Sequence, residues 1–513
     1  MILENGVVHT LDPSLPRAGA LAIAGDRIAG GVGTHETALA SPERIDLRGR
    51  CVLPGFTDSH VHFPSWSLVQ HQVRLEEAES LDEALARVAT AVADVEPGRW
   101  LRGYGWRSAA WSPRTEPTRQ TLDAVSGSVP VALMSKDYHS IWLNSAALER
   151  ADGELDVPGG VVERDEHGEP TGILREECAW HFRDVHVRPT HAEMVEATRA
   201  GLKIANARGV TSVHDKDGWL GALGVWQELE QEGSLTLRVW QSLPHGHIDA
   251  LTEMGMRSGL GSELVRIGYI KAFMDGTLGS RTARLMDGSG VEITTRDEFE
   301  DIVRRAARAG FPVAVHAIGD RANRDALDAF EAAAEDWRPA GLRQRIEHAQ
   351  LLTWEDVPRF SAIGVAASVQ FSHGPSDRDL AEANWAGMTE RAYASRSLLD
   401  AGAVVANGSD APVEELDPLL GVRAGVLRTL DERDAWHPEQ RVTLEEAFHA
   451  TCVAPAWLTG DERRRGKLLP GFLADLVVLD RDPFECAPEE LAGMRVVATM
   501  LGGRWVFGAP PWD

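Results

Sequence analysis

The stretch Pro54-Gly55-Phe56-Thr57-Asp58-Ser59-His60-Val61-His62 decides how this sequence of 513 residues is interpreted. Side chains on a β-strand alternate between its two faces, so two histidines separated by one residue point the same way. His60 and His62 are therefore candidate ligands for one metal ion. The apolar segment Cys51-Val52-Leu53 precedes them and predicts a buried strand whose end carries the pair. Two nearby histidines are not a specific signal, so the rest of the chain must supply the context.

The composition narrows the classes of partner that we expect. The chain has 52 basic and 78 acidic residues, and its formal net charge of -26 argues against binding nucleic acid or an anionic membrane surface. The first ten residues lack a secretory signal pattern and no later run is long enough to span a membrane, so we expect a cytoplasmic protein. The four cysteines are scattered without a CxxC pair, which is typical of reduced, buried thiols and not of disulfides or a zinc ribbon.

Both ends of the chain have the pattern of short β-strands broken by Gly and Pro. In residues 1–50 we expect strands at 2–10, 20–24, 27–32 and 44–47, and in residues 451–513 we expect strands at 474–479 and 496–501. Neither end is long enough to bury the face of a sheet alone. We therefore expect the two ends to meet in one small β-sandwich domain.

Residues 51–450 alternate apolar, strand-like segments with helical ones. With the segment that ends at His60, eight strands are predicted, the other seven being 210–214, 235–243, 265–273, 312–317, 345–349, 364–369 and 404–409. Eight such alternations are the pattern of an α/β fold, the (β/α)8 or TIM barrel, whose sites lie at the carboxyl ends of the strands. The segment 63–188 alternates helical pieces with loops rich in Trp, Gly and Pro, and we expect it to be a large insertion after strand 1 that covers the site. Capping-box spacing at Ser80, Thr190 and Thr295 predicts that a helix begins after each of them.

Metal-binding residue types occur on the strands or just after them, where a barrel would place its site. Any one of these residues has an ordinary structural explanation, but a chance scatter is not expected to place them on so many strands. The candidates are His60 and His62 on strand one, Lys271 on strand four, His316 on strand five, His348 on strand six and Asp410 after strand eight.

Lys271 is unusual because it lies inside an apolar strand, in line with Tyr269 and Phe273. One interpretation is a lysine whose stem lines the barrel while its amine reaches water. The other is a buried lysine with a depressed pKa, because burial disfavours the ammonium form. The neutral amine can then add carbon dioxide, and the resulting carbamate can bridge two metal ions.

Asp410 follows Asn407-Gly408-Ser409 in an abrupt turn after strand eight. A carboxylate in this place can bind a metal and can also accept a proton from a metal-bound water, whose pKa falls to about 7 on zinc. Asp410 is therefore the candidate general base. Asp320 lies near His316, but it is expected to be the N-cap of a helix.

Nine stretches in the expected order make the sequence similar to the amidohydrolase superfamily, and within it to family 3, the YtcJ-like group that includes N-substituted formamide deformylases. They include PGFTDSHVHF (54–63), KDYHSIWLNSAAL (136–148), IKAFMDGTLGSRTA (270–283), HAIGDRAN (316–323), RIEHAQ (345–350) and NGSDAPV (407–413). The resemblance implies a metal-dependent hydrolase with a distorted (β/α)8 barrel and a β-sandwich built from both termini. It also implies that His60, His62 and Asp410 bind the more buried metal, that carboxylated Lys271 bridges, and that His316 and His348 bind the second metal.

These features predict an enzyme that hydrolyses a non-peptide carbon-nitrogen bond of a small molecule through a metal-activated hydroxide. One or two divalent ions are expected in each chain, and zinc is the expected metal. The alternatives are that the same site hydrolyses an ester or carbamate, or that the chain is a non-catalytic relative with the same fold. A homodimer is the commonest assembly for such an enzyme. Candidate substrate contacts are Trp106, His139, Asn144 and Arg281, each with an alternative role in packing or bracing.

Overall fold

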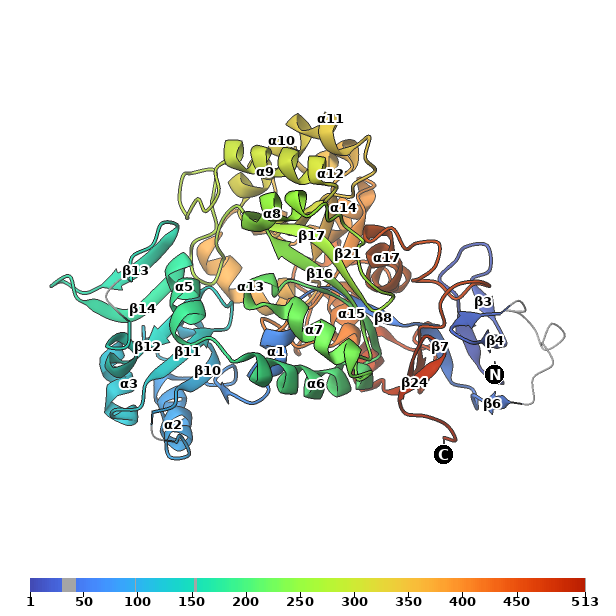
Figure 1. Cartoon of the computed structure of the whole chain (residues 1–513), viewed down its shortest axis with the longest axis horizontal. Coiled ribbons are helices and arrows are strands. Elements are labelled where there is room, and N and C mark those ends of the chain that lie inside the picture. The colour runs from blue at the N-terminus through green and yellow to red at the C-terminus, as the bar shows by residue number, and fades with distance from the viewer. Residues whose placement is uncertain (30–42, 97, 152–154, 513) are drawn as a thin grey trace.

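The chain folds around a central barrel, with the insertion on one side of it and the two chain termini on the other (Figure 1). The computed structural model describes residues 1–29, 43–96, 98–151 and 155–512. The predicted fold class, an α/β barrel with an insertion and a β-layer from both termini, is confirmed by this arrangement.

The barrel is a parallel sheet of eight strands in the order β21-β20-β19-β18-β17-β16-β15-β8. It is nearly closed, and the segment after β21 joins the first strand where the Asp410 backbone N–H donates to the His60 carbonyl at 2.7 Å. The strands are β8 (Phe56–Val61), β15 (Val210–Asp215), β16 (Arg238–Pro244), β17 (Val265–Phe273), β18 (Val313–Ala317), β19 (Arg345–His348), β20 (Ala366–Val369) and β21 (Val405–Asn407).

Helices pack around the barrel and enclose its apolar outer face. The predicted capping boxes at Thr190 and Thr295 are both formed, since each threonine side chain accepts a hydrogen bond from the backbone N–H three residues later. Asp320 is not the N-cap of its helix, because Gly319 holds that position. The helices are α1 (Phe63–Val69), α6 (His191–Ala207), α7 (Ala222–Gln231), α8 (Ile248–Glu253), α9 (Arg296–Ala309), α10 (Asp320–Ala332), α11 (Ala334–Trp337), α12 (Val357–Ile363), α13 (His373–Asn384), α14 (Ser395–Asp400), α15 (Pro418–Leu427), α16 (Leu444–Phe448) and α17 (Ala454–Leu458).

The insertion is built on a sheet, whereas the sequence pattern had indicated helical pieces and loops. Six strands pair in the order β13-β14-β12-β11-β10-β9. The predicted helix at its start is present as α2 (Leu81–Val92), capped by Ser80. The strands are β9 (Val73–Arg74), β10 (Leu101–Trp106), β11 (Val131–Ser135), β12 (Ser140–Leu143), β13 (Gly160–Arg164) and β14 (Pro170–Glu176), and the other helices are α3 (Arg119–Ser126), α4 (Ser145–Leu148) and α5 (Glu177–His186).

The two ends of the chain share a sheet of six strands in the order β24-β23-β22-β7-β2-β3, and a second sheet has the order β5-β4-β1-β6. The segment Cys51–Pro54 forms β7 of this terminal sheet and is not the start of the first barrel strand. Gly55 allows the chain to pass from β7 to β8, because a Cβ there would meet the Thr211 side chain at 2.4 Å. The remaining strands are β1 (Ile2–Glu4), β2 (Val7–His9), β3 (Arg17–Ala18), β4 (Leu21–Ala24), β5 (Arg27–Ile28), β6 (Arg44–Asp46), β22 (Leu476–Leu479), β23 (Val496–Leu501) and β24 (Arg504–Phe507).

Further predictions from the sequence concern the cysteines, membrane-spanning segments and residues 30–32. All four cysteines are free thiols, as predicted. Within the described ranges, no helix combines the length and the apolar character needed to cross a bilayer. Residues 30–32, the end of one predicted strand, lie outside the described residues.

Candidate metal centre

The six predicted ligands gather at the carboxyl ends of the barrel strands. They come from five strands, because His60 lies on β8 and His62 directly follows it, while the others lie on or just after β17, β18, β19 and β21. All six line one cavity: His60, His62, Lys271, His316, His348 and Asp410.

Three of these side chains form a compact group of metal-binding atoms. One donor atom from each of His60, His348 and Asp410 lies within 4.8 Å of the others. The His60 Nε2 atom is 3.2 Å from the Asp410 carboxylate, and His62 Nε2 is 3.7 Å from the same oxygen. The spacing and the types of donor atom fit a divalent ion such as zinc.

In three of the candidate ligands, His60, His62 and His348, the ring nitrogen Nδ1 is hydrogen-bonded to an oxygen acceptor. His60 Nδ1 is 2.7 Å from Glu347, His62 Nδ1 is 2.9 Å from Asp217, and His348 Nδ1 is 2.9 Å from Gln370. With the proton on Nδ1, each imidazole donates to its acceptor and leaves Nε2 for a metal. Such partners fix both the tautomer and the orientation of a metal-binding histidine.

His316 is hydrogen-bonded through its other ring nitrogen, Nε2. Its Nε2 atom is 3.1 Å from the Gly276 carbonyl oxygen, to which the protonated nitrogen donates. This bond leaves Nδ1 as the nitrogen that can bind a metal. The imidazole is next to that of His348, with 4.6 Å between the ring centroids. His316 can therefore extend the compact group toward a second ion.

Lys271 is a buried lysine whose amine has no hydrogen-bond partner among the described residues. Its Nζ lies 4.4 Å from the centre of the Phe273 ring and lines the same cavity as the histidines. Burial lowers the pKa of this amine to about 8. A substantial fraction of the Lys271 amine is therefore neutral near pH 8. The neutral amine is the form that reacts with carbon dioxide.

The charges around the centre favour metal-binding protonation states. Burial alone would raise the pKa of the Asp410 carboxyl, but His60 and His348 hold it well below its usual value. Burial also lowers the pKa values of His60, His348 and His316, so the imidazoles stay neutral. A carboxylate surrounded by neutral imidazoles is a suitable donor set for a divalent cation.

Backbone conformation explains how Glu347 and His348, which are neighbours in the chain, both reach the centre. His348 has a φ of 74° and Asp410 has a φ of 59°, both in the left-handed region that non-glycine residues rarely adopt. The alternation of β19 therefore ends at His348. As a result, Glu347 bonds to His60 while the His348 ring packs against the same histidine at 4.7 Å. Strained backbone of this kind concentrates at functional sites.

Sequence reasoning missed the buried charges beneath the centre. The Glu347 Oε1 atom is 3.0 Å from Lys216 Nζ and 2.8 Å from Arg345 Nε, and all three side chains are fully buried. The Arg345 guanidinium also lies over the Tyr269 ring at 4.1 Å and contacts His214 at 3.1 Å. One signal was available in the sequence, since Lys216 directly follows a buried strand in a chain with few lysines.

A cavity of about 350 Å³ is lined by the candidate ligands and by residues of both the barrel and the insertion. Of the predicted substrate contacts, Trp106, His139 and Arg281 line it. His139 bonds through Nδ1 to Glu176 at 2.5 Å, and its ring lies 5.3 Å from that of His316. Arg281 is 3.5 Å from Glu116, which agrees with the alternative that it braces its loop.

Asn144 is the exception among the predicted substrate contacts. It is fully buried and is not one of the described residues that line the cavity. Its side-chain oxygen caps α4 by accepting from the Ala147 N–H at 2.9 Å, and its amide donates to Ser126 at 2.8 Å. These bonds occupy the side chain in local structure, because asparagine is a favoured N-cap residue.

One wall of the cavity is aromatic. Trp180 and Trp219 both pack against Phe273, with ring centroids 5.2 Å and 5.5 Å away, and Phe273 is 5.3 Å from the His316 ring. The lining contains eight Lys or Arg side chains and eight Asp or Glu side chains, so its formal positive and negative charges are equal in number. Ion pairs such as Lys136 with Glu414 at 3.1 Å and Arg107 with Asp377 at 3.2 Å provide partners for lining cations, whereas the Lys271 amine has none among the described residues. The cavity therefore suits an uncharged molecule with a flat apolar group.

Comparisons with known proteins agree with this architecture. The chain is 30% identical to a putative amidohydrolase YtcJ of Bacillus subtilis, over 99% of both chains. It is 28% identical to an N-substituted formamide deformylase of Arthrobacter pascens, over 98% of this chain and 97% of that one. A solved structure of an uncharacterized metal-dependent hydrolase from Pyrococcus horikoshii is 29% identical, with a TM-score of 0.78 over 95% of this chain and 99% of that one.

The model of the Amidohydrolase family matches residues 43–507, which span the barrel, the insertion and, of the terminal strands, β6, β7, β22, β23 and β24. The resemblance seen in the sequence motifs is thereby confirmed. This chain is a member of the amidohydrolase family and a metal-dependent hydrolase.

Proposed function

We propose that this protein hydrolyses a carbon-nitrogen bond, other than a peptide bond, in a small uncharged molecule. The observation that carries the proposal is the compact group of His60, His348 and Asp410 donor atoms, within 4.8 Å of one another and at the floor of the cavity. The similarity to an N-substituted formamide deformylase supports the choice of an amide-like bond.

The residues present fit one or two divalent ions, and zinc is the metal that we propose. His60, His62 and Asp410 would hold one ion, and His316 and His348 would hold a second, with carboxylated Lys271 between them. The orphaned, buried amine of Lys271 supports this last role. A bound ion supplies Lewis acidity, which polarises the substrate carbonyl and lowers the pKa of water.

Asp410 is the proposed acid and base. Its low pKa keeps the carboxylate ionised, so it can take a proton from the attacking water. The same carboxyl group then returns that proton to the leaving nitrogen, which departs as a neutral amine. The aromatic wall of Trp180, Phe273 and Trp219 holds an apolar part of the substrate, and His139 approaches its polar part from the insertion. Holding these groups together lowers the entropic cost of the reaction.

A paired panel of amides and esters tests the reaction class. Each amide is matched by an ester with the same acyl group, and each pair is made in a neutral aromatic form and an anionic form. We expect the zinc-loaded, full-length protein to hydrolyse neutral aromatic amides, to lose this activity with chelator and to regain it with zinc. Hydrolysis of the esters alone would favour the alternative chemistry. Turnover that is unaffected by chelator would exclude the proposed site.

Metal content tests the ligand set separately. Elemental analysis of protein purified without chelator and with bicarbonate should find up to two ions per chain that depend on the ligands of this centre. The Lys271→Ala variant should lose a large part of that metal, because it removes the proposed bridge. The matched control is Lys203→Ala, which changes a lysine on the exposed side of α6 and should keep the metal content. Equal metal loading in the parent and in the Lys271→Ala variant would exclude the bridge.

A further inference from the structure

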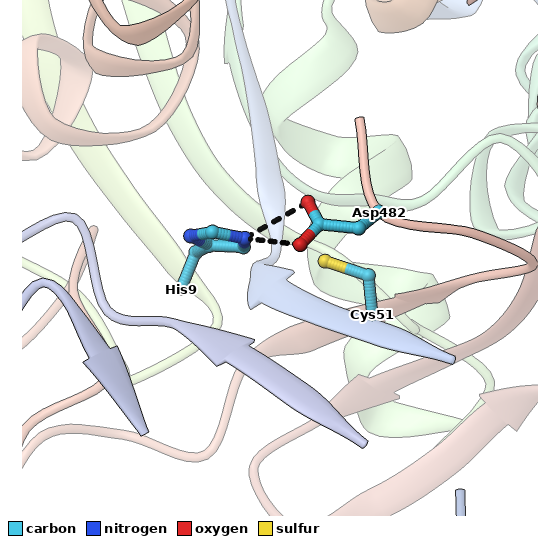
Figure 2. A group of neighbouring side chains, drawn as sticks. All are labelled: His9, Cys51 and Asp482. Carbon is cyan, nitrogen blue, oxygen red and sulfur yellow. Dashed lines mark hydrogen bonds and ion pairs between the residues drawn. The ribbon is translucent and has the colours of Figure 1, made fainter. Parts of the chain in front are cut away.

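The terminal sheet contains a second group of metal-binding side chains, outside the cavity. His9 lies at the end of β2, Cys51 begins β7, and Asp482 follows β22 by three residues. One donor atom from each lies within 4.8 Å of the other two. Figure 2 shows the carboxylate between the imidazole and the thiol, with the sulfur directed toward it.

Strand pairing is what assembles this group. β7 is the middle strand, paired with β2 in parallel and with β22 in antiparallel. Val7 is opposite Cys51, and His9 is two residues further along β2, so His9 and Cys51 share a face of the sheet. Leu479 is opposite Cys51 on the other side, which brings the following segment and Asp482 to the same place.

We propose that His9, Cys51 and Asp482 bind a zinc ion that clips the amino-terminal and carboxyl-terminal segments of the chain together. A thiolate, an imidazole and a carboxylate are all zinc ligands, and the thiolate disfavours magnesium and calcium. A tetrahedral zinc site needs donor atoms about 3.3 to 3.6 Å apart. The imidazole and carboxylate are now 2.9 Å apart and the sulfur lies within 4.8 Å of both, so ion binding requires the first pair to move apart and the sulfur to approach.

Burial and charge are consistent with this ligand set. The Cys51 side chain is fully buried and its sulfur has no hydrogen bond within the described ranges, while His9 is 13% exposed and leaves room for water as a fourth ligand. Binding releases the thiol proton, so one thiolate and one carboxylate balance the two charges of the ion. The His9 imidazole then carries its proton on Nδ1 and binds through Nε2.

Arg17 is the competing cation at this place. Its Nη2 atom is 3.7 Å from Asp482 but 2.8 Å from Glu485, and its side chain is 52% exposed. The guanidinium therefore has its closer partner elsewhere and can stay with Glu485 when an ion is bound. Without an ion, His9 and Asp482 form an ordinary hydrogen-bonded pair beside a protonated thiol.

Cobalt substitution distinguishes this site from the barrel centre, because none of the ligands proposed for the centre is a cysteine. The full-length protein, freed of metal and loaded with Co²⁺, should show a thiolate-to-cobalt charge-transfer band in the near ultraviolet. The band should disappear in Cys51→Ser and in His9→Gln. It should persist in Cys486→Ser, a control that removes a nearby thiol, and in Asp410→Asn, which alters only the barrel centre.

Elemental analysis gives a second measurement. Cys51→Ser and His9→Gln should each hold one zinc ion fewer per chain than the parent, and turnover at the barrel centre should be retained. If Cys51→Ser does not fold, His9→Gln alone decides the matter. The proposal is overturned if the cobalt-loaded parent has no such band, or if the band survives both substitutions. The proposed catalytic function is tested by turnover and stands or falls independently of this band.

Discussion

The carboxylate of Glu347 lies 2.7 Å from Nδ1 of His60 and 2.8 Å from Nε of Arg345, with all three side chains buried. A candidate metal ligand is thus oriented by a carboxylate, and that carboxylate is kept ionised by a buried cation. Burial alone would raise the pKa of Glu347, but Arg345, Lys216 and His60 hold it well below its usual value.

Glu347→Gln should destabilise the protein by about 3–5 kcal/mol, because it leaves the buried charge of Arg345 uncompensated. The measurement is the free energy of unfolding in urea. The double variant Glu347→Gln/Arg345→Met should recover part of this loss, since it removes the unpaired cation. A double variant as unstable as the sum of its single variants would contradict the explanation.

Asp410→Asn should retain most of the metal but lose turnover by about 10² to 10⁴-fold, because asparagine cannot accept the proton from water. Steady-state kinetics and elemental analysis on the same sample measure the two effects. Asp379→Asn, which changes a carboxylate that is 79% exposed, is the matched control and should behave as the parent. Full activity in the Asp410→Asn variant would exclude Asp410 as the base.

Lys271 should acquire carbon dioxide in a pH-dependent manner. Its pKa is lowered by burial from 10.5 to about 8, so the reactive neutral amine increases as pH rises through 8. In metal-free protein with ¹³C-bicarbonate, the carbamate signal in ¹³C NMR should grow between about pH 7 and pH 9. Lys203→Met should keep the signal and Lys271→Met should lose it. A signal that survives Lys271→Met would assign the carbamate to another lysine.

The same shift predicts how stability depends on pH. Between about pH 8 and 10.5 the unfolded chain binds a proton at Lys271 that the folded chain does not bind, so stability increases with pH in this window. Below about pH 8, Lys271 is protonated in both the folded and the unfolded chain. Burial of the ammonium then lowers the free energy of unfolding by its full amount, about 3 kcal/mol. Urea unfolding of metal-free, bicarbonate-free protein should show this slope, and Lys271→Met should reduce it. An unchanged slope in that variant would mean that another group titrates.

Trp219→Ala should raise the KM for neutral aromatic substrates by up to about tenfold and should change kcat little. The tryptophan is 36% exposed on the cavity wall, so its loss removes a stacking contact worth about 0.5–1.5 kcal/mol without opening the core. Trp354→Ala is the matched control, because Trp354 is 47% exposed and lies outside the cavity lining. An equal KM in both variants would remove Trp219 from the substrate site.

The sequence by itself determined the barrel and the residue types at its mouth. Alternating apolar segments predicted all eight strands, since a parallel strand must bury both of its faces, and the capping boxes at Thr190 and Thr295 located two helices. Parallel strands bring their carboxyl ends together, so the predicted strands also indicated that the six candidate ligands lie close to one another. All six now line one cavity.

Only the tertiary structure decided what surrounds those ligands. Glu347 belongs to the centre because His348 adopts a φ of 74°, which the period of a strand does not predict. Asn144 had the residue type of a substrate contact, but it is used as a helix cap in the insertion. His9, Cys51 and Asp482 lie far apart in the chain, and only strand pairing brings them together. Local patterns specify elements, whereas contacts between distant residues depend on how those elements pack.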